Sequence, residues 1–146
     1  MSIAIGSDHA GFELKKIIIT YLEEIKKDFL DLGTCSAERV DYPDFGFKVA
    51  QAVATGQCRL GIAICGTGIG ISMTANKVKG IRAAVCCSEY MAEMARRHND
   101  ANVLALGGRV ITPEIAKRIV RVFLETAFDG GRHAERIQKI EQLTHL

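Results

Sequence analysis

Short apolar runs alternate along the chain with longer stretches in which apolar residues recur at helical spacing. The runs predict five strands, at residues 2–6, 29–32, 60–64, 82–87 and 103–106. The stretch after the first run is typical of the rest, because Ile18 and Leu22 share a helix face while Lys15, Lys16 and Glu23 interrupt the apolar sequence. Strands without a polar face that alternate with amphipathic helices predict a parallel sheet covered on both sides.

Local signals predict where the helices begin and end. A helix follows the first strand at about residues 12–25, and Pro43 opens the next, which reaches about Thr55. A glycine-rich loop leads into a third helix that ends near Val78. Ser88 caps a fourth helix that runs to about Arg97. The last two helices are predicted at 112–128 and, after a Gly-Gly pair, at 133–143.

These elements predict an α/β, flavodoxin-like (Rossmann-type) three-layer sandwich with an extra C-terminal helix. The simplest right-handed arrangement of its five-stranded parallel sheet has the strand order 2-1-3-4-5. Residues 1–146 contain no repeat or linker-like tract, which predicts a single domain. Ligands of such sheets bind where the winding reverses, here between the loops 7–11 and 65–70.

Charge and cysteine usage narrow the class of protein. The chain has 19 Lys and Arg against 17 Asp and Glu, so its net charge of +2 gives no broad basic face for nucleic acid or an anionic membrane. Glycines interrupt the longest uncharged stretch, 60–76, which argues against a membrane span. The 5 cysteines form no C-x-x-C motif and the opening residues do not resemble a signal peptide. Reduced thiols and a cytoplasmic location are therefore expected.

The loop Cys65-Gly66-Thr67-Gly68-Ile69-Gly70 ends a strand and opens a helix, so its backbone N–H groups can converge on an anion. A tight turn built from small residues is the alternative interpretation. The sequence lacks the lysine of a P-loop, and the glycine spacing differs from that of a dinucleotide-binding fingerprint. Ile71 stands where a cysteine phosphatase needs arginine.

Three further groups are candidates for chemistry. Cys65 lies where a thiol is most readily activated, whereas Cys58 and Cys86 are interpreted as inert buried cysteines. Asp8 and His9 follow the first strand and place an acid and an imidazole beside the cysteine loop, although a turn and cap pair is the simpler reading.

The third group is cationic. Arg132 and Arg136 share one helix face, and Arg109 follows the last strand, so the three guanidinium groups suit a phosphomonoester. A solvated helix face is the alternative for the pair. His98 stands at a predicted helix end, where a positive charge is favourable without any catalytic role. No H-x-x-x-H or Cys/His cluster suggests a metal site.

Several long motifs together are similar to those of type B ribose-5-phosphate isomerases, within the wider sugar-phosphate isomerase family. They occur in unchanged order over nearly the whole chain: IGSDHAG (5–11), DYPD (41–44), GIAICGTGIGIS (61–72), ANK (75–77), RHNDANVLALGGR (97–109) and GGRHAERIQKIE (130–141). The resemblance implies a homodimer with shared active sites, possibly a higher oligomer, in which the Cys65 loop of one chain meets His98 and Asn99 of the other. It also implies that the enzyme interconverts aldose and ketose phosphates through a cis-enediol(ate) without metal or other cofactor.

The resemblance also implies a role for each matching residue. Cys65 corresponds to the base that moves a proton between C2 and C1, and His98 to the acid/base that opens the sugar ring with help from Asp8. The loop from Gly66 through Thr67, Gly68 and Ile69 to Gly70 corresponds to the cradle of the enediolate oxygen. The remaining matches are phosphate or substrate contacts: His9, Tyr42, Asn99, Arg109, Arg132 and Arg136. A branch of the family that uses a glutamate base differs from this chain, which has Ile71 at that place.

The resemblance favours the ribose 5-phosphate to ribulose 5-phosphate reaction of the pentose phosphate pathway. An isomerase of allose 6-phosphate or galactose 6-phosphate is the first alternative, because relatives with the same loop use six-carbon sugars. A non-catalytic flavodoxin-like module that binds a phosphorylated metabolite is the second. Neither nucleic acid nor a membrane is expected as a partner.

Overall fold

The computed structural model describes residues 2–146, which form a five-stranded parallel sheet and six helices. The elements follow one another as β1 (Ile3–Ser7), α1 (Phe12–Glu24), β2 (Phe29–Asp31), α2 (Tyr42–Ala54), β3 (Leu60–Cys65), α3 (Ile69–Ala75), β4 (Ala83–Val85), α4 (Glu89–Arg97), β5 (Val103–Gly107), α5 (Pro113–Glu125) and α6 (Arg132–Thr144). The predicted α/β fold with a parallel sheet is confirmed.

The strand order is β2-β1-β3-β5-β4, so the predicted order 2-1-3-4-5 is wrong at one edge. The strand β5 is buried throughout and pairs with β3, whereas β4 is short, half-buried and pairs only with β5. The longer, fully buried strand takes the inner position, and the short, less buried strand takes the edge. The reversal of winding between β1 and β3 is unaffected.

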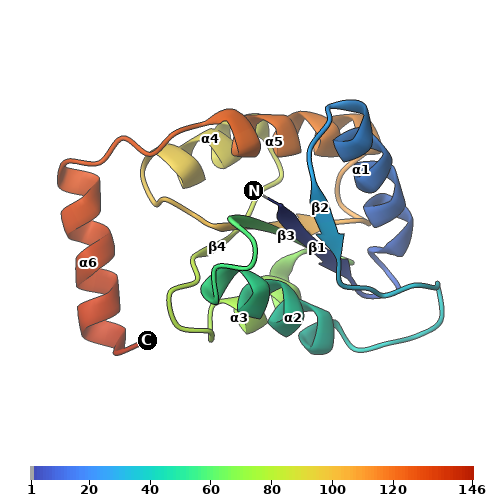
Figure 1. Cartoon of the computed structure of the whole chain (residues 1–146), viewed down its shortest axis with the longest axis horizontal. Helices are drawn as coiled ribbons and strands as arrows, with labels where there is room; N and C mark the ends of the chain where they lie inside the picture. The colour runs from blue at the N-terminus through green and yellow to red at the C-terminus, as the bar shows by residue number, and fades with distance from the viewer. Residues whose placement is uncertain (1) are drawn as a thin grey trace.

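The exchange of β4 and β5 also decides which face α4 covers. Right-handed connections that cross the sheet in opposite directions place their helices on opposite faces. Because the chain moves outward to β4 and then back to β5, α3 and α4 lie on different sides. Figure 1 shows α1, α4 and α5 on one face of the sheet and α2 with α3 on the other.

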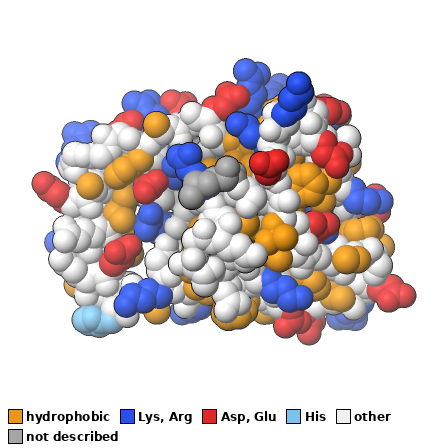
Figure 2. All heavy atoms as spheres, in the orientation of Figure 1, with side chains coloured by type: hydrophobic (Ala, Val, Ile, Leu, Met, Phe, Trp, Pro, Cys, Tyr) orange, Lys and Arg blue, Asp and Glu red, His pale blue; other side chains and the backbone are white. Residues whose placement is uncertain are grey.

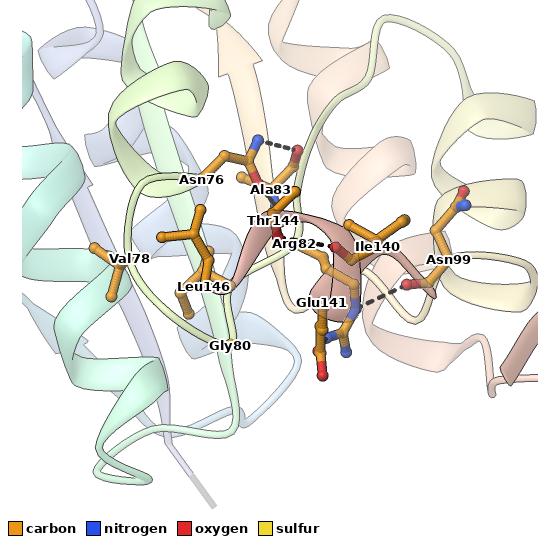
Figure 3. Close-up of a pocket in the computed structure, with 11 residues that line it drawn as sticks. Asn76, Val78, Gly80, Arg82, Ala83, Asn99, Ile140, Glu141, Thr144 and Leu146 are labelled. Atoms are coloured by element: carbon orange, nitrogen blue, oxygen red, sulfur yellow. Dashed lines mark hydrogen bonds and ion pairs between the residues drawn. The ribbon is translucent and has the colours of Figure 1, made fainter. Parts of the chain in front are cut away.

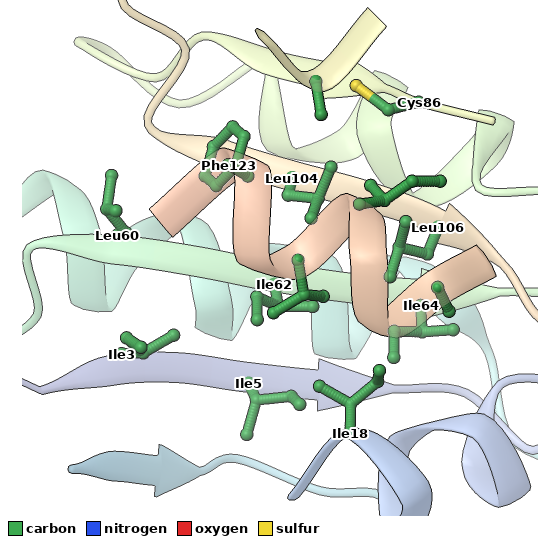
Figure 4. Packing of buried hydrophobic residues seen from close by; sticks show 14 of the residues in the cluster. Ile3, Ile5, Ile18, Leu60, Ile62, Ile64, Cys86, Leu104, Leu106 and Phe123 are labelled. Carbon is green, nitrogen blue, oxygen red and sulfur yellow. The ribbon is translucent and has the colours of Figure 1, made fainter. Parts of the chain in front are cut away.

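The two faces of the sheet are packed differently. On the side of α1, α4 and α5, large branched side chains from the central strands meet Phe123 and Ile18 (Figure 4). On the other side the sheet presents small residues, and a Cβ at Gly61 would lie 2.7 Å from Cγ1 of Val49. This close approach lets α2 lie directly on the backbone of β1 and β3.

Most of the predicted helix ends are confirmed. The Ser88 hydroxyl accepts a hydrogen bond from the Met91 N–H, and the Thr112 hydroxyl accepts one from the Ile115 N–H, as N-caps do. The helix α5 ends at Glu125, short of the predicted Phe128, and α3 ends at Ala75 rather than near Val78. Within residues 2–146, no helix combines the length and apolar character that a membrane crossing needs.

The C-terminal helix α6 stands at one end of the molecule, away from the sheet (Figure 1). It is attached through buried His133 and Ile137 and through the ion pair of Glu141 with Arg82, 3.2 Å apart. Two of its apolar side chains, Ile140 and Leu143, are exposed. On the face of the molecule in Figure 2, basic and acidic side chains are interspersed.

A buried ion pair joins α1 to the end of β2. The Lys15 side chain is 1% exposed and its ammonium donates to the Asp31 carboxylate, which is 37% exposed and also accepts from the Gly33 N–H. A cation at this depth depends on its one carboxylate partner, because water cannot replace it.

Asp31→Ala is therefore expected to lower the free energy of unfolding by about 2–3 kcal/mol, because it leaves the Lys15 charge buried and unpaired. Lys15→Met removes the charge and keeps the packing volume, so its cost should stay below about 1 kcal/mol. Urea denaturation measures both variants. Lys16→Met, which breaks the exposed pair with Glu13, is the matched control and should change stability by less than about 0.5 kcal/mol. Equal losses for Asp31→Ala and Lys15→Met would contradict this account.

Candidate active site

Three loops meet at the carboxyl ends of β1, β3 and β5, where the sequence predicted the site. The Gly108 N–H donates to the Cys65 carbonyl over 2.8 Å, and the Arg109 N–H donates to the Gly66 carbonyl over 3.0 Å. A Cβ at Gly11 would lie 2.5 Å from the Ile64 carbonyl oxygen, and one at Gly108 would lie 2.9 Å from that of Ala10. The loops thus touch backbone to backbone, which only glycine at these positions permits.

Cys65 ends β3, and its sulfur points into the loop that follows. The sulfur is buried and lies 3.1 Å from the Gly68 N–H, which donates to it. Gly68, directly before α3, has a φ of +81°, a left-handed conformation that favours glycine. The Thr67 hydroxyl accepts from the Ile69 N–H over 3.2 Å and is itself exposed. The loop therefore offers backbone donors beside a thiol.

Asp8 and His9 lie next to this loop and are each held by one backbone contact. The buried Asp8 carboxylate accepts from the Gly11 N–H over 3.0 Å. Nδ1 of His9 lies 3.0 Å from the Val40 carbonyl and 3.2 Å from the Val40 N–H. Since Val40 occupies Nδ1 in either tautomer, Nε2 is the ring nitrogen available to a ligand.

Tyr42 and Arg109 border the loop on two sides. A Cβ at Gly70 would lie 2.6 Å from Cζ of Tyr42, so the phenol ring packs on the bare backbone there. A Cβ at Gly66 would lie 3.5 Å from Nη1 of Arg109. Arg109 is exposed and takes part in none of the ion pairs formed within residues 2–146, so its guanidinium is available to an anion.

His98 and Asn99 lie at the opposite end of the strands, where β3 and β5 begin. His98 caps the C-terminus of α4, and the segment after it reaches the start of β3, where the Gly61 N–H donates to the Asn102 carbonyl over 2.9 Å. From Gly61 to Cys65 the strand β3 advances about 13 Å, and His98 lies beyond the Gly61 end. A single chain therefore does not bring His98 to the cysteine loop.

The sequence did not single out His133 or Asp129, yet both adjoin His98. The imidazole rings of His98 and His133 are stacked with centroids 4.2 Å apart and planes 9° from parallel. Burial lowers the pKa of His133, and the neighbouring His98, Arg132 and Arg136 lower that pKa further, against the opposite effect of Asp129. Arg132 and Arg136 thus belong with His98, away from Cys65. A contact between residues 35 apart in sequence leaves no local signal.

Possible ligand atoms of His98, Asp129 and His133 all lie within 4.8 Å of one another. A metal ion binds imidazole along a lone pair in the plane of the ring. Because the two rings are stacked, their lone pairs run side by side and do not converge on one point. This cluster is thus arranged as a stack, and one ring would have to turn before an ion could bind.

A hollow of about 290 Å³ lies between α6 and the segment that leads into β4 (Figure 3). Its walls include Val78, Arg82, Ile140 and Leu146, and Asn99 is the only predicted site residue among them. Nε of Arg82 donates to the Asn99 carbonyl over 3.0 Å, which fixes the backbone beside His98. The hollow lies under α6, and Cys65 is not among the residues that line it.

The fold and the two residue groups define an α/β enzyme class with a thiol in a glycine-rich loop at the carboxyl ends of the strands and an imidazole with two arginines at their amino ends. Residues 3–140 match the family model described as Ribose/Galactose Isomerase. The chain belongs to this family.

Its relatives resemble it over nearly their full length. Ribose-5-phosphate isomerase B of Escherichia coli K12 is 51% identical over 138 residues, which are 94% of this chain and 93% of that protein. The solved structure of Clostridium thermocellum ribose-5-phosphate isomerase B has a TM-score of 0.98 and 55% identity, with 99% and 98% of the two chains covered. That of the Mycoplasma genitalium enzyme with bound ribulose-5-phosphate has a TM-score of 0.94 and 46% identity, with 99% and 96% covered.

The environment of Cys86 sets it apart from a reactive cysteine. Burial raises the pKa of the Cys86 thiol to about 12, and Cys87 adds to the shift. Because burial disfavours the thiolate, Cys86 should keep its proton at pH 9 and resist iodoacetamide, whereas the exposed Cys35 should be alkylated. Mass spectrometry of the native protein after brief treatment measures both. Similar rates at the two cysteines would show that the burial of Cys86 is wrong.

Proposed function

We propose that this chain interconverts ribose 5-phosphate and ribulose 5-phosphate by the chemistry of its own residues, at sites shared between two subunits. Membership of the isomerase family and about 50% identity to ribose-5-phosphate isomerases B support the reaction. The single observation that carries the assignment of the base is the Cys65 sulfur, which ends β3 within reach of a loop N–H.

The first step is ring opening. The protonated imidazole of His98 gives a proton to the ring oxygen and the Asp8 carboxylate takes the proton of the C1 hydroxyl, so that the C1–O bond to the ring breaks and an aldehyde forms. Imidazole titrates near neutral pH and can both give and take this proton. The buried carboxylate of Asp8 assists from the other side of the sugar.

The second step moves one proton. The Cys65 thiolate takes the proton from C2, the electron pair moves to the carbonyl oxygen on C1, and a cis-enediolate results. Backbone N–H groups of residues 66–70 and the exposed Thr67 hydroxyl stabilise the negative oxygen. The proton of the C2 hydroxyl then passes to the negative oxygen on C1, the thiol returns its proton to C1, and C2 becomes the ketone, which completes the isomerisation.

The phosphate suits the unpaired cations of both residue groups. His9 and Arg109 approach it from the cysteine loop, and Arg132 with Arg136 approach it from α6. Guanidinium groups bind phosphate oxygens in pairs, and no acidic side chain within residues 2–146 pairs with these three arginines. Tyr42 and Asn99 contact the sugar.

Two chains are needed because the Cys65 loop and His98 lie at opposite ends of the strands of one sheet. In a two-fold dimer, each site combines the Cys65 loop of one chain with His98 and Asn99 of the partner subunit, and symmetry makes both sites equal. The exposed Ile140 and Leu143 on α6 support a partner surface there. Residues 1–146 then act as one catalytic domain, α6 included. Its five free cysteines suit the reducing cytoplasm, where the pentose phosphate pathway operates.

Cys65→Ala should lower turnover of ribose 5-phosphate by 10²–10⁴-fold, on the order of 3–5 kcal/mol, because it removes the base. Exchange of the C2 hydrogen with solvent should disappear while the substrate still binds. Cys58→Ala, which removes another buried thiol far from the loop, is the control and should retain activity. A Cys65→Ala variant that keeps more than about a tenth of wild-type turnover would overturn the assignment of the base.

The shared site predicts complementation. Cys65→Ala and His98→Ala homodimers should each be inactive on ribose 5-phosphate, but a mixed dimer has one site with both changes and one site with neither. Random re-pairing of equal amounts makes about half the dimers mixed and should restore roughly a quarter of wild-type activity per site.

The experiment refolds the two inactive variants together, separates mixed dimers by a tag on one chain and measures isomerisation. Each variant refolded alone is the control. Mixed dimers without activity would place Cys65 and His98 in the same chain's site, and would leave the reaction itself unaffected.

A further inference from the structure

We propose that His133 is a positioning residue that holds the His98 imidazole by stacking and so serves ring opening but not proton transfer at carbon. The inference rests on the proposed function, because it gives His133 a part in one of the two steps described above. It starts from the contact between two rings that come from α4 and α6.

The geometry of the stack restricts His98 in one direction and leaves it free in another. With centroids 4.2 Å apart and planes 9° from parallel, His133 covers one face of the His98 ring. The His98 ring cannot tilt toward His133, while the nitrogens at the edge of the His98 ring stay uncovered. A ring fixed by its face presents its edge in a constant direction, which proton transfer to a sugar oxygen requires.

Hydrogen bonds to the linker between α5 and α6, residues 126–131, keep His133 at this place. Nε of Arg97 donates to both Asp129 carboxylate oxygens over 3.2 Å, and the Asp129 N–H donates to the Arg97 carbonyl over 3.0 Å. Glu93 holds the same guanidinium from the other side over 3.1 Å. The linker is thereby tied to the last turn of α4, the turn that ends at His98.

The surroundings of His133 favour its neutral form. Burial lowers the pKa of His133, and the neighbouring His98, Arg132 and Arg136 lower that pKa further, against the opposite effect of Asp129. His133 therefore acts on His98 through its ring face and is not a second proton donor.

Two measurements separate the steps in the intact protein. Ribose 5-phosphate is mainly cyclic and its turnover needs ring opening. Ribulose 5-phosphate has no free hydroxyl that can close a five-membered ring, because its C5 oxygen carries the phosphate. Deuterium uptake at C1 of ribulose 5-phosphate, followed by NMR in D₂O, therefore reports proton transfer by Cys65 alone.

His133→Ala and His133→Asn should lower turnover of ribose 5-phosphate by about tenfold or more, and deuterium uptake by less than about twofold. His133→Phe supplies a flat ring without a titratable nitrogen and should restore turnover to within about threefold of wild type. Ile137→Ala, one turn further along the buried side of α6, is the matched control for loosened docking of the helix and should affect both reactions alike.

An equal fall of turnover and deuterium uptake in His133→Ala would overturn the proposal, as would the same split in Ile137→Ala. Rescue by asparagine but not by phenylalanine would also overturn it, because a polar atom and not the ring face would then be the active feature. Failure of the reaction assignment looks different. In that case wild-type protein takes up no deuterium, or Cys65→Ala takes it up unchanged.

Discussion

The right-handedness of the connections in a parallel sheet is the constraint on which the site depends. Because the chain crosses outward to β4 and returns to β5, α4 must cover the face opposite to α3. Its C-terminus then lies beside the linker that leads from α5 to α6, and His98 meets His133. With β4 and β5 in sequential order, α4 would lie with α2 and α3, and the histidine stack would not form.

The cysteine loop depends on a second constraint, which is that the positions where the loops touch are glycines. Gly11, Gly107 and Gly108 allow three loops to touch through their backbones, and Gly68 turns its N–H toward the Cys65 sulfur. The small-residue face of the sheet continues this pattern below the loop, where Val49 lies against Gly61. This close backbone packing fixes the loop, and with it the Gly68 N–H that donates to the Cys65 sulfur.

The sequence was informative where function follows from a local position on a strand. Asp8 and Cys65 directly follow adjacent strands, so their proximity could be predicted from the fold class alone. The order of β4 and β5 could not, because it depends on the relative burial of two short apolar strands that look alike in sequence. The motif resemblance named His98 and implied a site shared between chains, but it did not group Arg132 and Arg136 with His98 or Arg109 with the Cys65 loop, as the structure does. The stack of His98 on His133 depends on that strand order and therefore also escaped prediction.

In the shared site proposed above, the separation of the two residue groups ties catalysis to association. There, a subunit alone carries every side chain that the reaction uses, yet it assembles none of them into a complete site. Specific activity therefore becomes a function of protein concentration, and it falls as dilution shifts the equilibrium toward free chains. By the same linkage, a sugar phosphate that contacts both chains draws subunits together, so that substrate itself stabilises the assembly that consumes it.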